Sequence, residues 1–167
     1  MNTTRKALFA IGGILIPAIA IATPPFGILS NVFPSQGRTA GALQEDLTVR
    51  RGGEDGEDWE LTLQTSGPAD FYSQEIVIGP GGYSGWHNHP GLLMVTVKEG
   101  AIDWYDRNCV KHTYTAGQSL TESNQPHTIV NSGTINTRLF GWYIIKAGEP
   151  RRVENGQPAC GVALGLR

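Results

Sequence analysis

Three of the four histidines in this 167-residue sequence have a spacing that suits a metal site. His87 and His89 flank a single residue, so on a β-strand both side chains point to the same face, about 7 Å apart along the backbone. Their ring nitrogens then reach one ion at about 2.1 Å. His127 follows a proline-containing turn and begins a short apolar segment, which makes it the candidate third ligand. His112 lies near Cys109 in a polar segment and is left out.

Histidine spacing alone leaves two other interpretations open. A His-x-His pair on a strand is also compatible with an exposed polar pair, and a buried histidine is often only hydrogen-bonded. The elements that must position these side chains are short segments bounded by Gly, Asn, Asp or Pro, which favours an all-β sandwich or barrel. The predicted strands cover residues 59–63, 71–78, 92–98, 101–105, 111–115, 127–131 and 138–145. Turns or loops are predicted at 50–58, 66–68 and 79–82.

Glycines at fixed distances from the histidines narrow the choice of fold further. The first group is Gly81, His87, His89, Leu93 and Gly100, and the second is Gly117, Glu122, Asn124, His127 and Asn131. This pattern resembles the two motifs of the cupin superfamily, G-x5-H-x-H-x3,4-E-x6-G and G-x5-P-x-G-x2-H-x3-N. The resemblance extends over about residues 71–145 and implies a cupin-type jelly-roll β-barrel.

The resemblance also implies a ligand set for a metal ion. His87, His89 and His127 take the family's histidine positions, but the family's glutamate falls at Leu93, or at Met94 if the spacing is longer by one. Neither side chain binds a divalent ion, so an all-histidine triad is expected. Because the three imidazoles are neutral, they leave the charge of a divalent ion uncompensated. The ligand types allow this ion to be Fe, Mn, Zn, Ni or Cu.

Other residues near the motifs have weaker functional interpretations. Glu122 and Asn124 stand where the second motif usually has proline and glycine, which concerns the shape of a turn. Glu122 and Gln125 are also candidates for a general acid or base and a polar contact, although ordinary turn residues are the favoured interpretation. Four aromatic residues either line a cavity or, as aromatic residues more often do, form the barrel core or lip: Tyr83, Trp86, Trp104 and Trp142. Catalytic and substrate-binding residues are left unassigned.

The N-terminal segment is predicted to be a signal peptide. Arg5 and Lys6 precede an apolar run, and Ala20 and Ala22 are small residues at the positions that a signal peptidase reads. The predicted organisation is a signal peptide over 1–22, a flexible linker over 23–45 that is rich in Pro, Gly and Ser, and a cupin domain over 46–167. The alternatives are an uncleaved anchor that tethers the protein to a membrane and a buried helix. The expected location is therefore extracytoplasmic, either secreted or periplasmic.

Cys109 and Cys160 are the only two cysteines in the chain. Outside the cytoplasmic membrane, this even number predicts one disulfide, since only one pairing exists. The alternative is two buried thiols that lie too far apart to bond. Neither cysteine has a C-x-x-C partner, which argues against a structural zinc site.

These observations favour an exported cupin-like protein that binds a divalent metal through His87, His89 and His127. The candidate activities of such a protein are those of an oxidoreductase (a dioxygenase) or an isomerase that acts on a small organic compound. The alternatives are a non-catalytic extracytoplasmic barrel that binds a small ligand, and a structural barrel that forms a homodimer. The net charge of −2 gives no basic footprint for nucleic acid.

Overall fold

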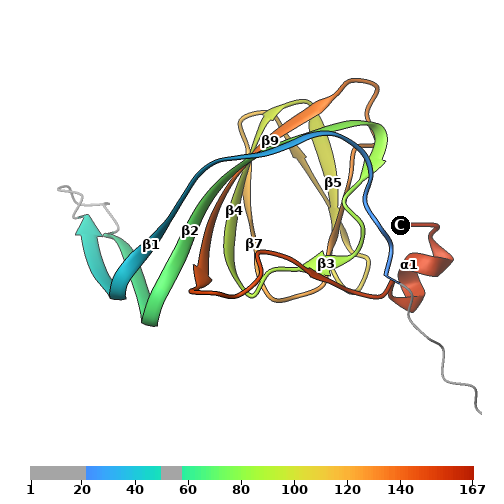
Figure 1. Cartoon of the computed structure of the whole chain (residues 1–167). Coiled ribbons are helices and arrows are strands. Elements are labelled where there is room, and N and C mark those ends of the chain that lie inside the picture. The colour runs from blue at the N-terminus through green and yellow to red at the C-terminus, as the bar shows by residue number, and fades with distance from the viewer. Residues whose placement is uncertain (1–21, 50–57) are drawn as a thin grey trace, which may run out of the picture.

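The computed structural model describes residues 22–49 and 58–167, so residues 1–21 of the predicted signal peptide and residues 50–57 of the predicted loop lie outside the described residues. Within the described residues, no helix has the length and apolar character needed to cross a membrane. The chain forms strands almost throughout, as Figure 1 shows. The elements are β1 (Phe26–Val49), β2 (Trp59–Tyr83), β3 (His87–Asn88), β4 (Gly91–Glu99), β5 (Ala101–Tyr105), β6 (Lys111–Thr115), β7 (Ser119–Glu122), β8 (Thr128–Val130), β9 (Thr137–Lys146), β10 (Val153–Glu154) and α1 (Ala159–Ala163).

One antiparallel sheet curls into a nearly closed, jelly-roll-like barrel (Figure 1). Its strand order is β6-β5-β8-β2-β9-β4-β7, and β1 adds to β2 at one side. A separate pair of short strands, β3 and β10, lies at one end of the barrel. The all-β class and the barrel predicted from the sequence are confirmed.

The core follows from alternation along the strands. In β9, Leu139, Tyr143 and Ile145 are buried inside the barrel, while Trp142, between two of them, faces outward and is exposed. Successive side chains of a strand point to opposite faces, so a single curled sheet can bury one face and expose the other. The buried cluster consists of Ile78, Leu93, Val95, Val97, Ile102, Leu120, Ile129, Leu139, Tyr143 and Ile145.

The flexible linker predicted for residues 23–45 is wrong for most of its length. Residues 26–45 belong to β1, which pairs with β2 in an antiparallel ladder. Composition suggested flexibility, but backbone pairing needs no particular side chain, and irregularities in register absorb the glycines and prolines of the segment. The turns predicted at 66–68 and 79–82 are wrong for the same reason, since β2 runs through both.

The strand predictions succeeded where turn residues bound an apolar segment on both sides. The segments 101–105 and 111–115 are observed as predicted, and β4 and β9 extend their predicted segments by one residue at each end. The short strand β7 was missed, and so was the helix α1.

Cys109 and Cys160 form a disulfide, which confirms the predicted pairing. Cys109 lies in the loop between β5 and β6, and Cys160 lies in α1. The bond therefore ties the C-terminal segment to the barrel.

The far ends of β1 and β2 leave the barrel as a two-stranded ribbon (Figure 1). We call residues 42–49 and 58–66 the arm. An ion pair marks the region where the arm meets the barrel: the Arg38 guanidinium donates to both carboxylate oxygens of Asp70, with 2.8 Å between Nη2 and Oδ2. The backbone N–H of Gly148 also donates to Asp70, at 2.9 Å. Together these bonds lower the pKa of Asp70 to about 2.

Candidate metal centre

The structure brings His87, His89 and His127 together at one end of the barrel interior. All three are buried, with at most 4% of any one exposed. The ring centroids are 4.9 Å apart for His87 and His89, 4.4 Å for His87 and His127, and 5.3 Å for His89 and His127. The His87 and His127 backbones also exchange two hydrogen bonds, at 3.0 and 2.8 Å. The three histidines selected from the sequence are therefore neighbours.

The turn before β3 requires glycine at one position. Gly85 has a φ of +72°, and a Cβ atom there would lie 2.0 Å from the Thr23 carbonyl oxygen. Any side chain would push the N-terminal segment away from this turn. The carbonyl of Gly85 in turn contacts the His87 ring, so this glycine helps to position the first histidine.

Each of the three imidazoles is oriented by a backbone carbonyl. The carbonyl oxygen lies 2.6–2.8 Å from Nδ1 in every case, and because it only accepts, Nδ1 carries the hydrogen. In the neutral rings, Nε2 is then the atom with a free lone pair. The Nε2 atoms of His89 and His127 are buried and lack a well-formed hydrogen bond. The three carbonyls belong to Gly85, Arg151 and Gln125.

A fourth side chain, Glu122, joins the three histidines. Its Oε2 lies 3.3 Å from Nε2 of His89 and 3.3 Å from Nε2 of His127, and the residue is 3% exposed. The potential ligand atoms of the four residues all lie within 4.8 Å of one another. The expected all-histidine triad is therefore incomplete, because a carboxylate supplies negative charge to the same cluster.

The strand register explains how Glu122 takes this place. Leu93, at the family's glutamate position, is the direct partner of Glu122 in the antiparallel pairing of β4 with β7. Directly opposed residues share one face of a sheet, so the carboxylate comes from the neighbouring strand. A partial signal in the sequence is the alternation over residues 119–122, which puts Glu122 on the same face of a strand as the apolar Leu120.

Trp104 fixes the carboxylate from the other side. Its indole Nε1 donates a hydrogen bond to Oε1 of Glu122 at 3.0 Å, and its ring stacks on His127 with 5.7 Å between centroids. Oε1 is thereby engaged, and Oε2 is left facing the histidines. Contacts of this kind orient metal ligands and influence metal affinity.

The cluster fits a transition-metal ion. Ligand atoms about 2.1 Å from one ion lie about 3.0–4.2 Å apart in tetrahedral or octahedral arrangements, close to the separations found here. Two lone pairs and a carboxylate oxygen that face one another in a buried site repel unless a cation lies between them. Imidazole and carboxylate donors together suit Fe, Mn, Zn, Ni and Cu.

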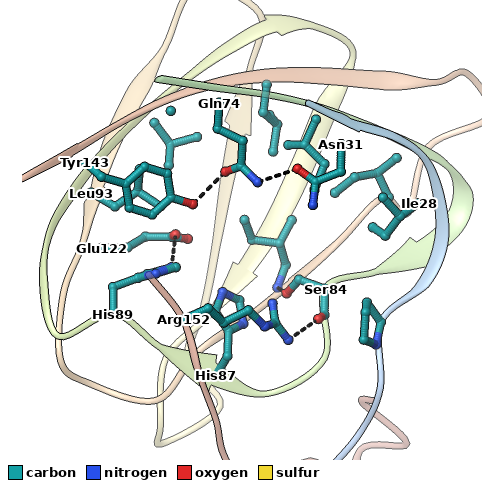
Figure 2. A pocket seen from close by; sticks show the side chains of 17 residues that line it. Ile28, Asn31, Gln74, Ser84, His87, His89, Leu93, Glu122, Tyr143 and Arg152 are labelled. Atoms are coloured by element: carbon teal, nitrogen blue, oxygen red, sulfur yellow. Dashed lines mark hydrogen bonds and ion pairs between the residues drawn. The ribbon is translucent and has the colours of Figure 1, made fainter. Parts of the chain in front are cut away.

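A cavity of about 140 Å³ opens from this cluster into the barrel (Figure 2). It is close in size to an apolar cavity of about 150 Å³ that holds benzene, so its space suits a ligand of about one small ring. Most of its wall is apolar, and the aliphatic part comes from Ile28, Ile76, Ile78, Leu93, Val95, Ile129 and Leu139. The strand β1 covers part of the cavity, since Ile28 and Asn31 both line it.

Comparison with known proteins agrees with this geometry. The family model described as "Cupin domain" matches residues 74–143, which include all four residues of the cluster. The chain belongs to the cupin superfamily. Among curated proteins, none matches the sequence.

Solved structures of other cupins are similar to this chain at low identity. One is the Cupin_2 domain of an XRE family transcriptional regulator from Enterobacter cloacae, with 21% identity, coverage of 48% of this chain and 83% of that chain, and a TM-score of 0.40. Another is a cupin-like protein from Thermotoga maritima, with 18% identity, coverage of 52% and 65%, and a TM-score of 0.47. A polyketide cyclase from Streptomyces resistomycificus has 17% identity, coverage of 56% and 68%, and a TM-score of 0.45.

The last residue of the second motif has a structural role in this cupin. Asn131 is fully buried, and its side-chain amide donates to the carbonyls of Ile78 and Ile135 at 2.8 and 2.9 Å. It fixes the turn between β8 and β9 and lies outside the cluster. His112 also lies outside the cluster, and it is the cross-strand partner of Trp104, with 5.7 Å between ring centroids.

The aromatic residues considered from the sequence fall into different places. Trp104 contacts Glu122 and His127, as described above. Trp86 is fully buried but does not line the cavity, and Trp142 is 46% exposed on the outside of the barrel. Tyr83 stacks on Phe26, with 5.6 Å between ring centroids.

The charges of the cluster favour a bound cation. Burial lowers the pKa of His87 well below its ordinary value, and nearby His127 and Arg152 lower it further, so His87 is neutral and able to ligate. Burial acts to raise the pKa of Glu122, but His127 and His89 outweigh it, and the pKa falls well below its usual range. Burial acts to lower the pKa of His127, whereas the Glu122 carboxylate raises it above the ordinary value. A proton on His127 therefore competes with metal binding.

Proposed function

We propose that this cupin is an enzyme that binds one divalent transition-metal ion through His87, His89, Glu122 and His127. The observation that carries the proposal is the convergence of four buried ligand atoms at the end of a mostly apolar cavity. Three neutral imidazoles and one carboxylate leave a divalent ion with a net charge of about +1. An anionic or hydroxyl oxygen of a substrate is therefore attracted to the same place.

The proposed substrate is a small organic compound with an apolar body and an oxygen-bearing end. The aliphatic wall of the cavity binds the body, and the volume of about 140 Å³ limits its size. The resident ion supplies a Lewis-acidic or oxygen-activating centre, which is the chemistry of a metal-dependent oxidoreductase or isomerase.

Three hydrogen-bonded side chains form a polar wall across the cavity from the histidines (Figure 2). The Tyr143 hydroxyl donates to Oε1 of Gln74 at 2.6 Å, and Nε2 of Gln74 donates to Oδ1 of Asn31 at 2.7 Å. Burial and the Glu122 carboxylate raise the pKa of Tyr143, so the phenol keeps its proton at neutral pH. These groups orient a second polar atom of the substrate.

Arg152 adds a positive charge to the wall of the cavity near the histidines. Its Nη2 donates to the carbonyl of Ser84 at 2.7 Å and to Oε2 of Glu154 at 2.8 Å. Glu154 and the Ser84 carbonyl thus hold the guanidinium in one orientation beside the cavity. In this position it favours the anionic form of a bound substrate.

A metal-content assay on matched histidine variants tests the proposal. The full chain is purified, incubated in turn with Fe, Mn, Zn, Ni and Cu, desalted and measured by elemental analysis. We expect close to one ion per chain in the wild type, the same in His112→Ala, and little in His127→Ala. His112 serves as the control because it lies outside the cluster. A wild type that holds none of the five metals, or a His127→Ala variant that holds as much as the wild type, would contradict the proposal.

A second measurement separates catalysis from simple ligand capture. The loaded protein is incubated with small hydroxylated and carboxylated compounds, and both oxygen uptake and new masses are recorded. Turnover that the metal-free protein lacks supports the enzyme. Compounds that bind at the cavity and are recovered unchanged would instead indicate a non-catalytic binding barrel.

We also propose that the protein is exported and that residues 1–22 are removed. The proposal rests on the charge and hydrophobicity of that segment, and a disulfide suits an oxidising compartment. N-terminal sequencing of protein recovered outside the cytoplasm should begin at Thr23. A chain that begins at Met1 in the membrane fraction would indicate a tether instead, and an intact chain in the cytoplasm would contradict export.

A further inference from the structure

A second hollow, of about 470 Å³, adjoins the cavity at its polar wall. We call it the vestibule. Four residues line both the cavity and the vestibule: Asn31, Gln74, Tyr143 and Arg152. The vestibule is also lined by Phe33 of β1, Tyr72 of β2 and the residues 149–151 that follow β9. Because the two hollows share these side chains, a molecule that extends past the polar wall occupies both.

Arg151 connects the vestibule with the candidate metal centre. Its backbone carbonyl accepts the hydrogen of His89 Nδ1 at 2.6 Å, whereas its side chain lines the vestibule. The guanidinium carbon lies 3.8 Å from the ring centroid of Phe33 and 4.9 Å from that of Tyr72. At these distances both rings attract the guanidinium through cation–π contacts and cover part of its flat surface. The positive charge of Arg151 is therefore held in place at the vestibule.

The charge of Arg151 differs from the other two charges of the vestibule in having no partner. The Arg152 guanidinium donates to Glu154, and Oε1 of Glu149 lies 3.6 Å from Nζ of Lys146. Over residues 22–49 and 58–167, the Arg151 guanidinium contacts aromatic rings but forms no ion pair and donates no hydrogen bond. Its five N–H donors lie in one plane and match the two oxygens of a carboxylate. The vestibule thus offers a fixed donor set that an anion can satisfy.

A row of aromatic rings leads from Arg151 to the metal cluster. The ring of Tyr72 packs edge-on against that of Tyr143, with 6.4 Å between centroids. The ring of Tyr143 packs edge-on against His89 in turn, with 5.5 Å between centroids. Aromatic side chains offer a large apolar surface, so this row gives the body of a ligand a surface to follow between the two sites.

We propose that the vestibule is a subsite for a carboxylate group of the substrate and that Arg151 binds this group. The carboxylate accepts two N–H bonds from the edge of the guanidinium, and the apolar body extends along Tyr143 into the cavity. The substrate class is then an organic acid whose apolar body reaches from the vestibule into the cavity. That the opposite end binds the metal rests on the proposed function, whereas the carboxylate subsite itself does not.

Titration calorimetry with two probes of the same body tests the subsite. The full chain is freed of metal by dialysis and titrated with phenylbutyrate, which has a carboxylate, and with phenylbutanol, which has a hydroxyl instead. We expect Arg151→Gln to raise the Kd of phenylbutyrate at least about tenfold and that of phenylbutanol less than about threefold, because only the carboxylate loses charged hydrogen bonds. Lys98→Gln removes one charge from an exposed residue outside both hollows and should bind like the wild type. A wild type that binds the acid no more tightly than the alcohol, or equal effects of the two variants, would overturn the proposal.

The metal content of Arg151→Gln separates direct binding from an effect on His89. The variant keeps the backbone carbonyl that orients His89, so it should hold as much metal as the wild type. Loss of metal together with loss of phenylbutyrate binding would show that the side chain acts by positioning His89, and it would overturn the subsite. A wild type that holds no metal but binds phenylbutyrate through Arg151 would contradict the proposed function and support the subsite.

Discussion

The strand β2 runs through both the barrel and the arm of this cupin, and the same alternation of side chains leads to different burial in the two regions. In the barrel, Ile78 of β2 packs in the buried core with side chains of β4, β8 and β9 and is 1% exposed. In the arm, Leu61 has the same type of side chain and the same kind of partner strand but is 49% exposed. Alternation therefore decides which residues share a face, whereas closure of the sheet decides whether that face is buried. The predictions below start in the barrel interior and end in the arm.

Moving the carboxylate across the sheet should have the largest effect. Glu122→Leu should lower metal affinity at least about 100-fold, since it removes the only negative ligand. Adding Leu93→Glu to this variant should recover at least about tenfold, because residue 93 is the direct partner of residue 122. Metal titration of the three proteins measures both steps. A single variant that binds metal like the wild type would show that the carboxylate is not a ligand.

A core truncation in the barrel should come next. Leu139 is 2% exposed and belongs to the buried cluster, so Leu139→Ala should lower the free energy of unfolding by about 2–5 kcal/mol. Urea unfolding followed by tryptophan fluorescence measures the loss. A change below about 1 kcal/mol would mean that the barrel interior is not tightly packed.

At the boundary between barrel and arm, stability should depend on pH through Asp70. Its pKa is lowered to about 2 by the Arg38 guanidinium and the Gly148 N–H, below the value of 3.8 expected when the chain is unfolded. A depressed pKa stabilises the folded state above 3.8, and this contribution is lost as pH falls through 2. Asp70→Asn should thus be less stable than the wild type at pH 7, by less than the core truncation.

The difference between the wild type and Asp70→Asn should shrink between pH 4 and pH 2, which chemical unfolding across that range can follow. The Arg38→Gln variant is the matched control, because it removes the main partner of the same carboxylate. A difference that stays constant over this range would show that the carboxylate charge has no part in stability.

The smallest effect is expected in the arm. Leu47 is 50% exposed, so Leu47→Ala should change the free energy of unfolding of the monomer by no more than about 0.5 kcal/mol. Thermal unfolding compares this variant with Thr48→Ala, whose side chain lies on the opposite face of the arm. A loss above about 1 kcal/mol for Leu47→Ala would show that the side chain is covered.

The sequence predicted the barrel and three of the four clustered residues because local rules suffice for them. The His87–Asn88–His89 spacing puts two imidazoles on one side, and bounded segments such as 101–105 identify their own ends. The jelly-roll fold was expected because the spacing of glycines and histidines in this chain resembles the two cupin motifs.

The fourth ligand and the arm were missed because both depend on pairing between distant segments. Glu122 becomes a ligand only when β7 pairs with β4 in one register, and no local pattern around residue 122 fixes that register. The segment 26–49 appeared flexible from its composition, yet its partner strand β2 holds it extended. In both cases the deciding interaction joins residues that are tens of positions apart.

The opposition of Leu93 and Glu122 has a consequence for how metal-binding barrels are recognised. Two directly opposed residues on adjacent strands project side by side from the same face of the sheet. A carboxylate at either position can therefore reach the same ion. A search that demands a carboxylate at the usual column of the first motif would discard such a chain as metal-free. A search that accepts a carboxylate at either of the two facing positions, 93 or 122, would retain it.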